Sequence, residues 1–287
     1  MPLVPIDLEA KSDNLSIIIY STWGAGKTHL AGTAPRPLYL DFENGTATLP
    51  NIKCDKCGRR YWIDKGTPCD VCKDLGGSAF RVTDVASLKQ AMNILSVIHK
   101  VRGKDEETKK KASEWIKNQI GAEVDLNTRT LIIDTLSRMQ ETEIIGILDS
   151  RDHTPKEKKQ DEDTMEMREW GILLTRMYRL MKLLPNDGFN IVLVAQAREF
   201  EDPHDKVRKW APNLRGQYGD QIGAYTDLVC YLEVKDVMET GQRKTIRRLY
   251  FQPTGSFMAK TRYNLPSYLD NPTFDKIHDL VMKERQV

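Results

Sequence analysis

Short apolar runs separated by longer amphipathic stretches dominate this chain of 287 residues. The runs are rich in Ile, Val, Leu and Tyr and are too short for helices, which is typical of strands buried on both faces of a parallel sheet. We expect such strands at residues 16–20, 37–41, 79–82, 130–134, 190–195 and 227–233. Two later runs, 245–252 and 257–262, flank a Pro-Thr-Gly-Ser turn and predict a hairpin.

Helical segments alternate with these strands. Apolar residues at helical spacing predict an amphipathic helix over 165–184 whose stripe packs into the core. The highly charged segment 104–119 predicts a solvated helix, and the polar segment 149–163 predicts a mobile loop. The alternation predicts an α/β fold with a mostly parallel central sheet flanked by helices on both faces. A ligand would bind beyond the carboxyl ends of the strands.

The first strand leads into Ser-Thr-Trp-Gly-Ala-Gly-Lys-Thr, residues 21–28, and then into a helix-compatible segment. This is the sequence form of a phosphate-binding loop, although Ser21 replaces the usual first glycine. The glycines allow backbone N–H groups to close around phosphate oxygens, Lys27 would reach the β- and γ-phosphates, and Thr28 would ligate Mg²⁺. The residues expected to bind ATP here are Thr22, Trp23, Gly24, Ala25, Gly26, Lys27 and Thr28.

Overall charge narrows the class of protein only slightly. Lys and Arg number 43 against 41 Asp and Glu, so any nucleic-acid contact must come from local patches. Residues 1–13 lack the basic and apolar regions of a secretory signal, and no apolar run approaches the ~20 residues that span a bilayer. We therefore expect a soluble cytoplasmic protein without a membrane partner. Its five cysteines then indicate thiols or metal ligands rather than disulfides.

Four cysteines form two Cys-x-x-Cys pairs, Cys54 with Cys57 and Cys69 with Cys72. Each pair can give two thiolates to one tetrahedral Zn²⁺, and four Cys ligands indicate a closed structural site. We expect a zinc ribbon at 52–77, inserted into a core formed by 1–51 and 78–287. Redox or merely buried cysteines are the alternative to a zinc site. The ribbon's hairpin contains basic and aromatic residues, so it could either contact DNA or be purely structural. The fifth cysteine, Cys230, is expected to be an ordinary buried thiol.

An acid ends the strand at 130–134 and is followed by a threonine. Asp134 is expected to hold Mg²⁺ together with Thr28. Thr135 cannot act as the base that activates water, so the base must come from another strand. Glu43, at the end of the strand that follows the phosphate-loop helix, is the candidate.

Three motifs occur in order along the chain: the phosphate loop, the Asp-Phe-Glu-Asn-Gly segment 41–45 and the Ile-Asp-Thr segment 133–135. In this order they resemble the RecA-like recombination ATPases, and more narrowly the phage-encoded single-domain RecA-like proteins of the Sak type, which are single-strand annealing proteins. The resemblance covers residues 15–50 and 78–270. It implies a RecA-like P-loop NTPase fold and an ATP-hydrolysing, single-stranded-DNA-binding protein of phage recombination, annealing or repair in the bacterial host cytoplasm.

The resemblance also assigns roles to later residues. Gln196, after the strand at 190–195, would sense the γ-phosphate. The Ala-Lys-Thr-Arg segment 259–262 resembles a family motif, and its cations would reach the neighbour's ATP in a ring or filament. Two solvated cations on an exposed hairpin are the alternative. The implied catalytic residues are Lys27, Glu43, Gln196, Lys260 and Arg262.

RecA-like proteins line a DNA channel with the loops that correspond to residues 149–163 and 198–219. The second loop mixes cations, which neutralise phosphates, with aromatic rings, which stack on bases. Its candidate DNA-binding residues are Arg198, Lys206, Arg208, Lys209, Trp210 and Arg215. A lid over the nucleotide is the alternative for this segment.

Two other function classes remain open. Some P-loop nucleotide phosphotransferases carry a four-cysteine zinc element in their lid, although that element usually comes later in the chain. A nucleotide-gated scaffold that loads another replication protein is the third hypothesis. A single-strand-binding or replication protein is the expected further partner.

Overall fold

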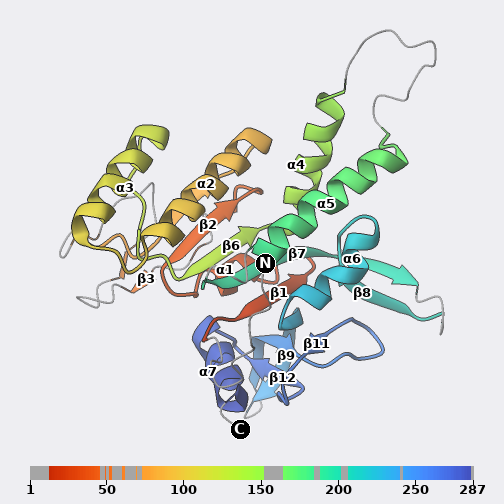
Figure 1. The fold of residues 1–287 in the computed structure, drawn as a ribbon. Helices are drawn as coiled ribbons and strands as arrows, with labels where there is room; N and C mark the ends of the chain where they lie inside the picture. The colour runs from red at the N-terminus through yellow and green to blue at the C-terminus, as the bar shows by residue number, and fades with distance from the viewer. Residues whose placement is uncertain are drawn as a thin grey trace, which may run out of the picture.

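A ten-stranded, mostly parallel sheet forms the centre of the molecule (Figure 1). The computed structural model describes residues 13–45, 49, 52–53, 60–61, 69, 73–151, 164–183, 188–201, 206–239 and 242–285. The sheet strands are β1 (Ser16–Ser21), β2 (Pro37–Asp41), β5 (Ser78–Arg81), β6 (Thr130–Asp134), β7 (Asn190–Glu201), β8 (Arg208–Pro212), β9 (Leu228–Glu239), β10 (Gln242–Tyr250), β11 (Lys260–Thr261) and β12 (Tyr268–Asp270).

Helices lie on both faces of this sheet. They are α1 (Lys27–Ala31), α2 (Val85–Val101), α3 (Glu106–Ile120), α4 (Leu136–Asp149), α5 (Met167–Leu183), α6 (Gln217–Gln221), the 3-10 helix η3 (Ile222–Tyr225) and α7 (Phe274–Arg285). Alternate β1 residues face opposite cores, as expected for a strand buried on both faces. Ile18 packs in the core that includes α2, α4 and α5 residues, whereas Ile17 packs in the core with α1 and α7.

The strand order is β12-β10-β9-β1-β7-β6-β2-β5, with β8 paired to β7 and β11 paired to β9. From β9 to β5 the neighbouring strands are parallel. Their registers align Ser21 with Gln196 and Asp41 with Asp134. Side chains from four separate strands therefore meet at one carboxyl edge, where a parallel sheet presents its ligand site. The mixed α/β architecture agrees with the expected P-loop NTPase fold.

The expected hairpin between residues 245–252 and 257–262 is wrong. β10 pairs antiparallel with β9 and β12, while β11 pairs with the start of β9. β9 continues well beyond residue 233, where it pairs with β10 outside the core. Exposed residues such as Val234 and Met238 alternate with polar ones there, so no continuous apolar run marks the strand.

The segment 198–219 is likewise not the expected loop. β7 continues to Glu201 and returns through β8, so most of this region is an antiparallel hairpin followed by α6. The segment 149–163 begins as the end of α4, and residues 152–163 lie outside the described part of the chain. The expected helices over 104–119 and 165–184 are present as α3 and α5.

Only parts of the expected zinc ribbon are described. Two short strands, β3 (Ile52–Lys53) and β4 (Arg60–Tyr61), pair antiparallel. Cys69 is buried, whereas Cys54, Cys57 and Cys72 lie outside the described residues. Among the described side chains, no group of three or more His, Cys, Asp or Glu residues is arranged to hold a metal ion. The zinc ribbon and its domain boundaries therefore stay predictions.

The fifth cysteine, Cys230, is fully buried in β9, and burial raises the pKa of its thiol. None of the helices in the described ranges combines the length and apolar character needed to cross a membrane.

Candidate nucleotide-binding and catalytic site

The loop between β1 and α1 has the backbone geometry of a phosphate-binding loop. Gly24 and Gly26 have φ of 75° and 92°, a left-handed region that disfavours side chains. A Cβ on Gly26 would also lie 2.5 Å from Arg247 Nε. Trp23, at the exposed tip, has 90% of its surface accessible. The loop therefore leads directly into the N-terminus of α1, where backbone donors favour anions.

Ser21 has a local role that a glycine could not fill. Its side chain is buried, its hydroxyl donates to Thr22 O at 2.8 Å, and it accepts from Lys27 Nζ at 3.2 Å. Its φ is not positive, so the position does not require glycine. The serine thus adds an oxygen acceptor for the loop lysine at the end of β1.

Lys27 and Glu43 are joined through Gln196. The Lys27 ammonium donates to Ser21 O at 3.1 Å, Thr22 O at 2.9 Å and Gln196 Oε1 at 3.4 Å. Gln196 Nε2 donates to both carboxylate oxygens of Glu43 at 3.2 and 3.0 Å. Burial lowers the pKa of Lys27, and the nearby carboxylates of Asp134 and Glu43 oppose this shift. The amide therefore connects the phosphate-loop cation with the candidate base.

Asp134 and Thr28 lie together at the corner of the site where we expect Mg²⁺ to bind. The Thr28 hydroxyl donates to Asp134 Oδ2 at 2.7 Å, and Tyr39 OH donates to the same oxygen. Burial raises the pKa of Asp134, while these two hydrogen bonds act in the opposite direction. A carboxylate and a hydroxyl are the hard oxygen ligands that Mg²⁺ prefers, so the donor set fits that ion. A Cβ on Gly45 would lie 3.6 Å from Thr28 Oγ1, which shows how closely the neighbouring loop approaches.

The loop that carries Glu43 is held by Asp41, whose Oδ1 accepts from the backbone N–H groups of Glu43 at 3.0 Å and Gly45 at 3.1 Å. Thr135 follows Asp134 through a cis peptide bond, and its hydroxyl donates to Glu43 Oε1 at 2.8 Å. The Asp-x-Glu-x-Gly motif therefore places a carboxylate by fixing its own backbone. A hollow of about 640 Å³ lies beside it, lined by residues such as Trp23, Glu43, Arg138 and Gln196.

Lys260 and Arg262 do not join their own chain's phosphate site. β11 pairs with the start of β9, at the amino ends of the parallel strands. The phosphate loop follows the carboxyl end of β1, on the opposite side of the sheet. The Lys260 ammonium donates to Gly223 O and Thr226 O, and Arg262 donates to Ala224 O at 2.6 Å. A role within the same nucleotide site is therefore excluded by position, and a role toward a neighbouring copy stays a prediction.

The candidate DNA-binding residues lie on the β7–β8 hairpin and just after it. Lys206, Arg208 and Arg215 are exposed, whereas Arg198, Lys209 and Trp210 are half-buried. Trp210 packs against the core, so its ring is only partly available for stacking. Arg208 lies 3.9 Å from Glu199 on the paired strand.

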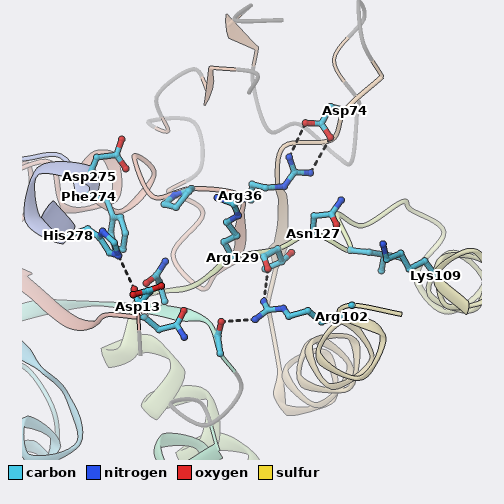
Figure 2. Close-up of a pocket in the computed structure, with 17 residues that line it drawn as sticks. Asp13, Arg36, Asp74, Arg102, Lys109, Asn127, Arg129, Phe274, Asp275 and His278 are labelled. Carbon is cyan, nitrogen blue, oxygen red and sulfur yellow. Dashed lines mark hydrogen bonds and ion pairs between the residues drawn. The ribbon is translucent and has the colours of Figure 1, made fainter. Parts of the chain in front are cut away.

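A larger hollow of about 830 Å³ lies at the amino ends of the strands, away from the phosphate loop (Figure 2). Its buried Arg36 donates to both Asp74 oxygens at 2.9 and 3.1 Å and to Asp125 at 2.8 Å. Arg102 donates to Gly188 O at 2.6 Å and Thr128 O at 2.8 Å. These arginines tie chain segments to the core, so size alone does not mark the functional site.

Two contacts at the nucleotide site have no motif in the sequence. Tyr39 reads only as an apolar strand residue, yet it bonds Asp134. Arg247, on β10, donates to Ala25 O at 3.2 Å from a strand distant in sequence. The Asp41–Gly45 motif begins two residues after Tyr39 and is the sequence signal nearest to it. Arg247 has no such motif beside it.

The comparisons with known proteins agree with this site. A family described as AAA domain matches residues 13–263, which include the phosphate loop, Glu43, Asp134 and Gln196. A search among curated proteins found no match. With most of its length matched and this nucleotide site assembled at the sheet edge, the chain belongs to the AAA domain family of nucleotide-binding P-loop ATPases.

Proposed function

We propose that this protein hydrolyses ATP with Mg²⁺ and couples turnover to single-stranded DNA in phage recombination, annealing or repair. The observation that carries the hydrolytic part is the connected set Lys27–Gln196–Glu43. Glu43 is placed to orient and deprotonate a water molecule, and Gln196 can report the change at the phosphates to the hairpin behind it. A phosphotransferase would have no need for that link.

ATP and Mg²⁺ fit the residues present. The glycine geometry of the loop suits phosphate oxygens, and Lys27 supplies a cation beside them. Thr28 and Asp134 would hold Mg²⁺, which supplies neutralisation of phosphate charge when bound.

The DNA-binding part is supported by the position of the β7–β8 hairpin. Gln196 lies on the same strand as Arg198, so a change at the nucleotide site reaches the hairpin within two residues. Lys206, Arg208 and Arg215 offer exposed cations for phosphates. We place DNA along this hairpin.

The placement of Lys260 and Arg262 supports assembly as a ring or filament. Because both lie at the edge opposite the phosphate loop, they can serve an ATP molecule only across an interface between copies. ATP would then bind between protomers. A single-strand-binding or replication protein is a further partner of this assembly.

A structural Zn²⁺ bound by Cys54, Cys57, Cys69 and Cys72 completes the proposal. The antiparallel pairing of β3 and β4 on either side of the first cysteine pair supports it. Backbone bonds from Lys73 N to Cys69 O and from Cys69 N to Asp74 O form a tight turn at the second pair. Metal analysis of purified protein should find one zinc per chain, and a Cys54→Ser/Cys57→Ser variant should lose it.

The deciding experiment is ATP turnover with Mg²⁺, with and without single-stranded DNA, at two salt concentrations. We expect DNA to stimulate turnover and the stimulation to fall as salt rises. Turnover that is indifferent to DNA would contradict the DNA-binding part. Transfer of phosphate to an added nucleoside monophosphate would instead favour a phosphotransferase.

A further inference from the structure

Two neighbouring hollows adjoin α5. The first, of about 320 Å³, is lined mainly by apolar atoms of residues that include Met167, Trp170 and Tyr218, together with Arg215. The second, of about 360 Å³, is lined by Arg168, Ile172, Thr175, Arg176 and Arg179. Gly171 belongs to both linings, so it lies between the first hollow, the apolar hollow, and the second, the basic groove.

Gly171 leaves open space in front of the helix backbone. A Cβ at this position would meet nothing within 4 Å, and its φ is not in the left-handed region. Glycine inside a helix is less favourable than alanine, and packing against the described residues gives no reason for it here. The absent side chain instead allows an external molecule to pass from one hollow to the other.

The arginines of the groove form one stripe along α5. Arg168, Arg176 and Arg179 repeat at spacings that place residues on one side of a helix. Arg176 pairs with Glu143 on α4 at 2.8 Å, whereas Arg168 and Arg179 form no ion pair with any described residue. From residue 168 to residue 179 the helix rises about 16 Å, enough to follow several linked anions.

Aromatic side chains, Trp170 and Tyr218 among them, line the apolar hollow. Tyr218 is buried, and its hydroxyl forms no hydrogen bond with the residues that the structure describes. Met167, 87% exposed, and half-buried Trp170 border the same hollow. An aromatic, mainly apolar pocket suits an unpaired nucleobase.

Arg215 connects this surface with the hairpin. Its backbone is fixed by Gln140, whose side chain accepts from Arg215 N at 2.7 Å and donates to Arg215 O at 3.0 Å. Its side chain remains exposed at the edge of the apolar hollow. Arg215, three residues after the end of β8, therefore borders the apolar hollow and follows the hairpin in the chain.

We propose that the cleft across Gly171 binds single-stranded DNA, with one unpaired base in the apolar hollow and the adjoining phosphates along Arg168, Arg176 and Arg179. This inference rests on the proposed DNA-binding function and adds a base-binding site on α5 to it. Double-stranded DNA fits poorly because its bases are stacked and unavailable to the pocket.

The test is binding of a fluorescent oligothymidine to the full chain, measured by anisotropy over a series of salt concentrations. Gly171→Leu should fold with an unchanged or higher Tm, because open space receives the new side chain. It should nevertheless weaken binding at least tenfold. Arg168→Gln/Arg179→Gln should weaken binding and reduce the salt slope by about 0.7 for each lost phosphate contact. The charge-matched control is Lys110→Gln/Lys117→Gln on α3, which should bind as the wild type does.

The outcomes separate the two proposals. If the wild type fails to bind the oligonucleotide at low salt, the proposed DNA-binding function is wrong and the cleft proposal falls with it. If the wild type binds and the α5 variants bind equally well, the cleft proposal alone is overturned. Equal weakening by the α3 control would also overturn it, because binding would then depend on overall charge.

Discussion

Gln196 lies where a base, a cation and a strand end meet, so the chemistry of the site depends on individual atoms. Its amide donates to Glu43 and accepts from Lys27, and its backbone N–H donates to Ser137 Oγ at 3.2 Å. Such a residue can report the state of the phosphates to β7. Glu43 itself is fixed by Thr135 and by the backbone contacts of Asp41.

Glu43→Gln should remove the base and leave nucleotide binding intact. We expect kcat for ATP to fall at least about 100-fold, the usual contribution of a positioned base. The Kd for a fluorescent ATP analogue should change little, because Lys27 and the loop are untouched. Glu114→Gln, on exposed α3, is the control. Full turnover in Glu43→Gln would show that the base lies elsewhere. The scaffold hypothesis would be favoured if Glu43→Gln left function intact while Lys27→Ala abolished it.

Tyr39→Phe tests the support behind the metal-binding corner. The change deletes one hydroxyl inside the core and leaves the buried Asp134 with one donor fewer. We expect the free energy of unfolding in urea to fall by about 1–3 kcal/mol, the cost of an unsatisfied buried partner. An unchanged denaturation midpoint would mean that the hydroxyl contributes nothing to the fold.

At this scale the sequence was informative where residues obey a motif. Glu43 could be proposed because it ends an apolar strand, and parallel strands end at one edge. Gln196 followed from the resemblance to RecA-like proteins. Ser21 was an unexplained departure until its hydroxyl was seen to accept from Lys27. Arg247 could not be found, because its contact with the loop depends on how β10 folds back along β9.

Among the elements, the end of α4 is connected to the start of α5 by an ion pair of Arg151 with Glu169. Arg151 donates to both Glu169 oxygens, at 2.7 and 2.6 Å, and to Thr164 O at 2.6 Å. This arginine lowers the pKa of Glu169 from 4.5 to about 2. The ion pair therefore fixes the relative ends of two helices, one leading from the nucleotide site and the other bearing the arginine groove.

Glu169→Gln should destabilise the protein in a pH-dependent way. Because folding lowers the carboxyl pKa, the contribution of Glu169 is complete above about pH 4.5 and is lost as the pH falls toward about 2. The Arg151 and Glu169 side chains are 14% and 13% exposed, so solvent screens the pair in part and we expect about 1 kcal/mol at pH 7. Urea unfolding of wild type and variant at pH 7, 5 and 3 should show the difference shrinking with acidity. A difference independent of pH would contradict the ion pair.

The strands buried on both faces and the helices were predictable from their patterns, whereas the pairing of the exposed strands was not. The core strands and α5 have clear apolar patterns, so their positions followed from periodicity. The hairpins β7–β8 and β9–β10 extend beyond the core, where alternation weakens and charged residues fill both strands. The pairing of β10 with β9 rather than with residues 257–262 depended on tertiary context.

The nucleotide site lies at the carboxyl ends of the parallel strands, whereas Arg262 lies at their amino ends. Arg262→Ala and Lys27→Ala should each have little ATPase activity alone. If Arg262 serves a neighbouring copy, mixing the two inactive variants should restore a measurable fraction of activity, because some interfaces combine an intact loop with an intact arginine. Mixtures that remain inactive, with assembly shown by light scattering, would contradict action across the interface.

Helix α4 offers a physical route between the nucleotide site and the proposed DNA surface. It begins after Thr135, which contacts Glu43, and it carries Ser137, which contacts Gln196; Gln140, one turn further, holds the backbone of Arg215. Coupling through such a route must be reciprocal: DNA should tighten ATP-analogue binding by the same factor by which the analogue tightens DNA binding.

Gln140→Leu tests this route. Leucine has a volume similar to that of glutamine but cannot form the two hydrogen bonds with the backbone of Arg215. We expect each ligand alone to bind within a few-fold of wild type, while the two coupling factors fall together toward one. Anisotropy titrations of each ligand, with and without the other, measure all four constants. Retention of the full coupling factor would place the route outside α4, and unequal factors would show that the titrations had not reached equilibrium.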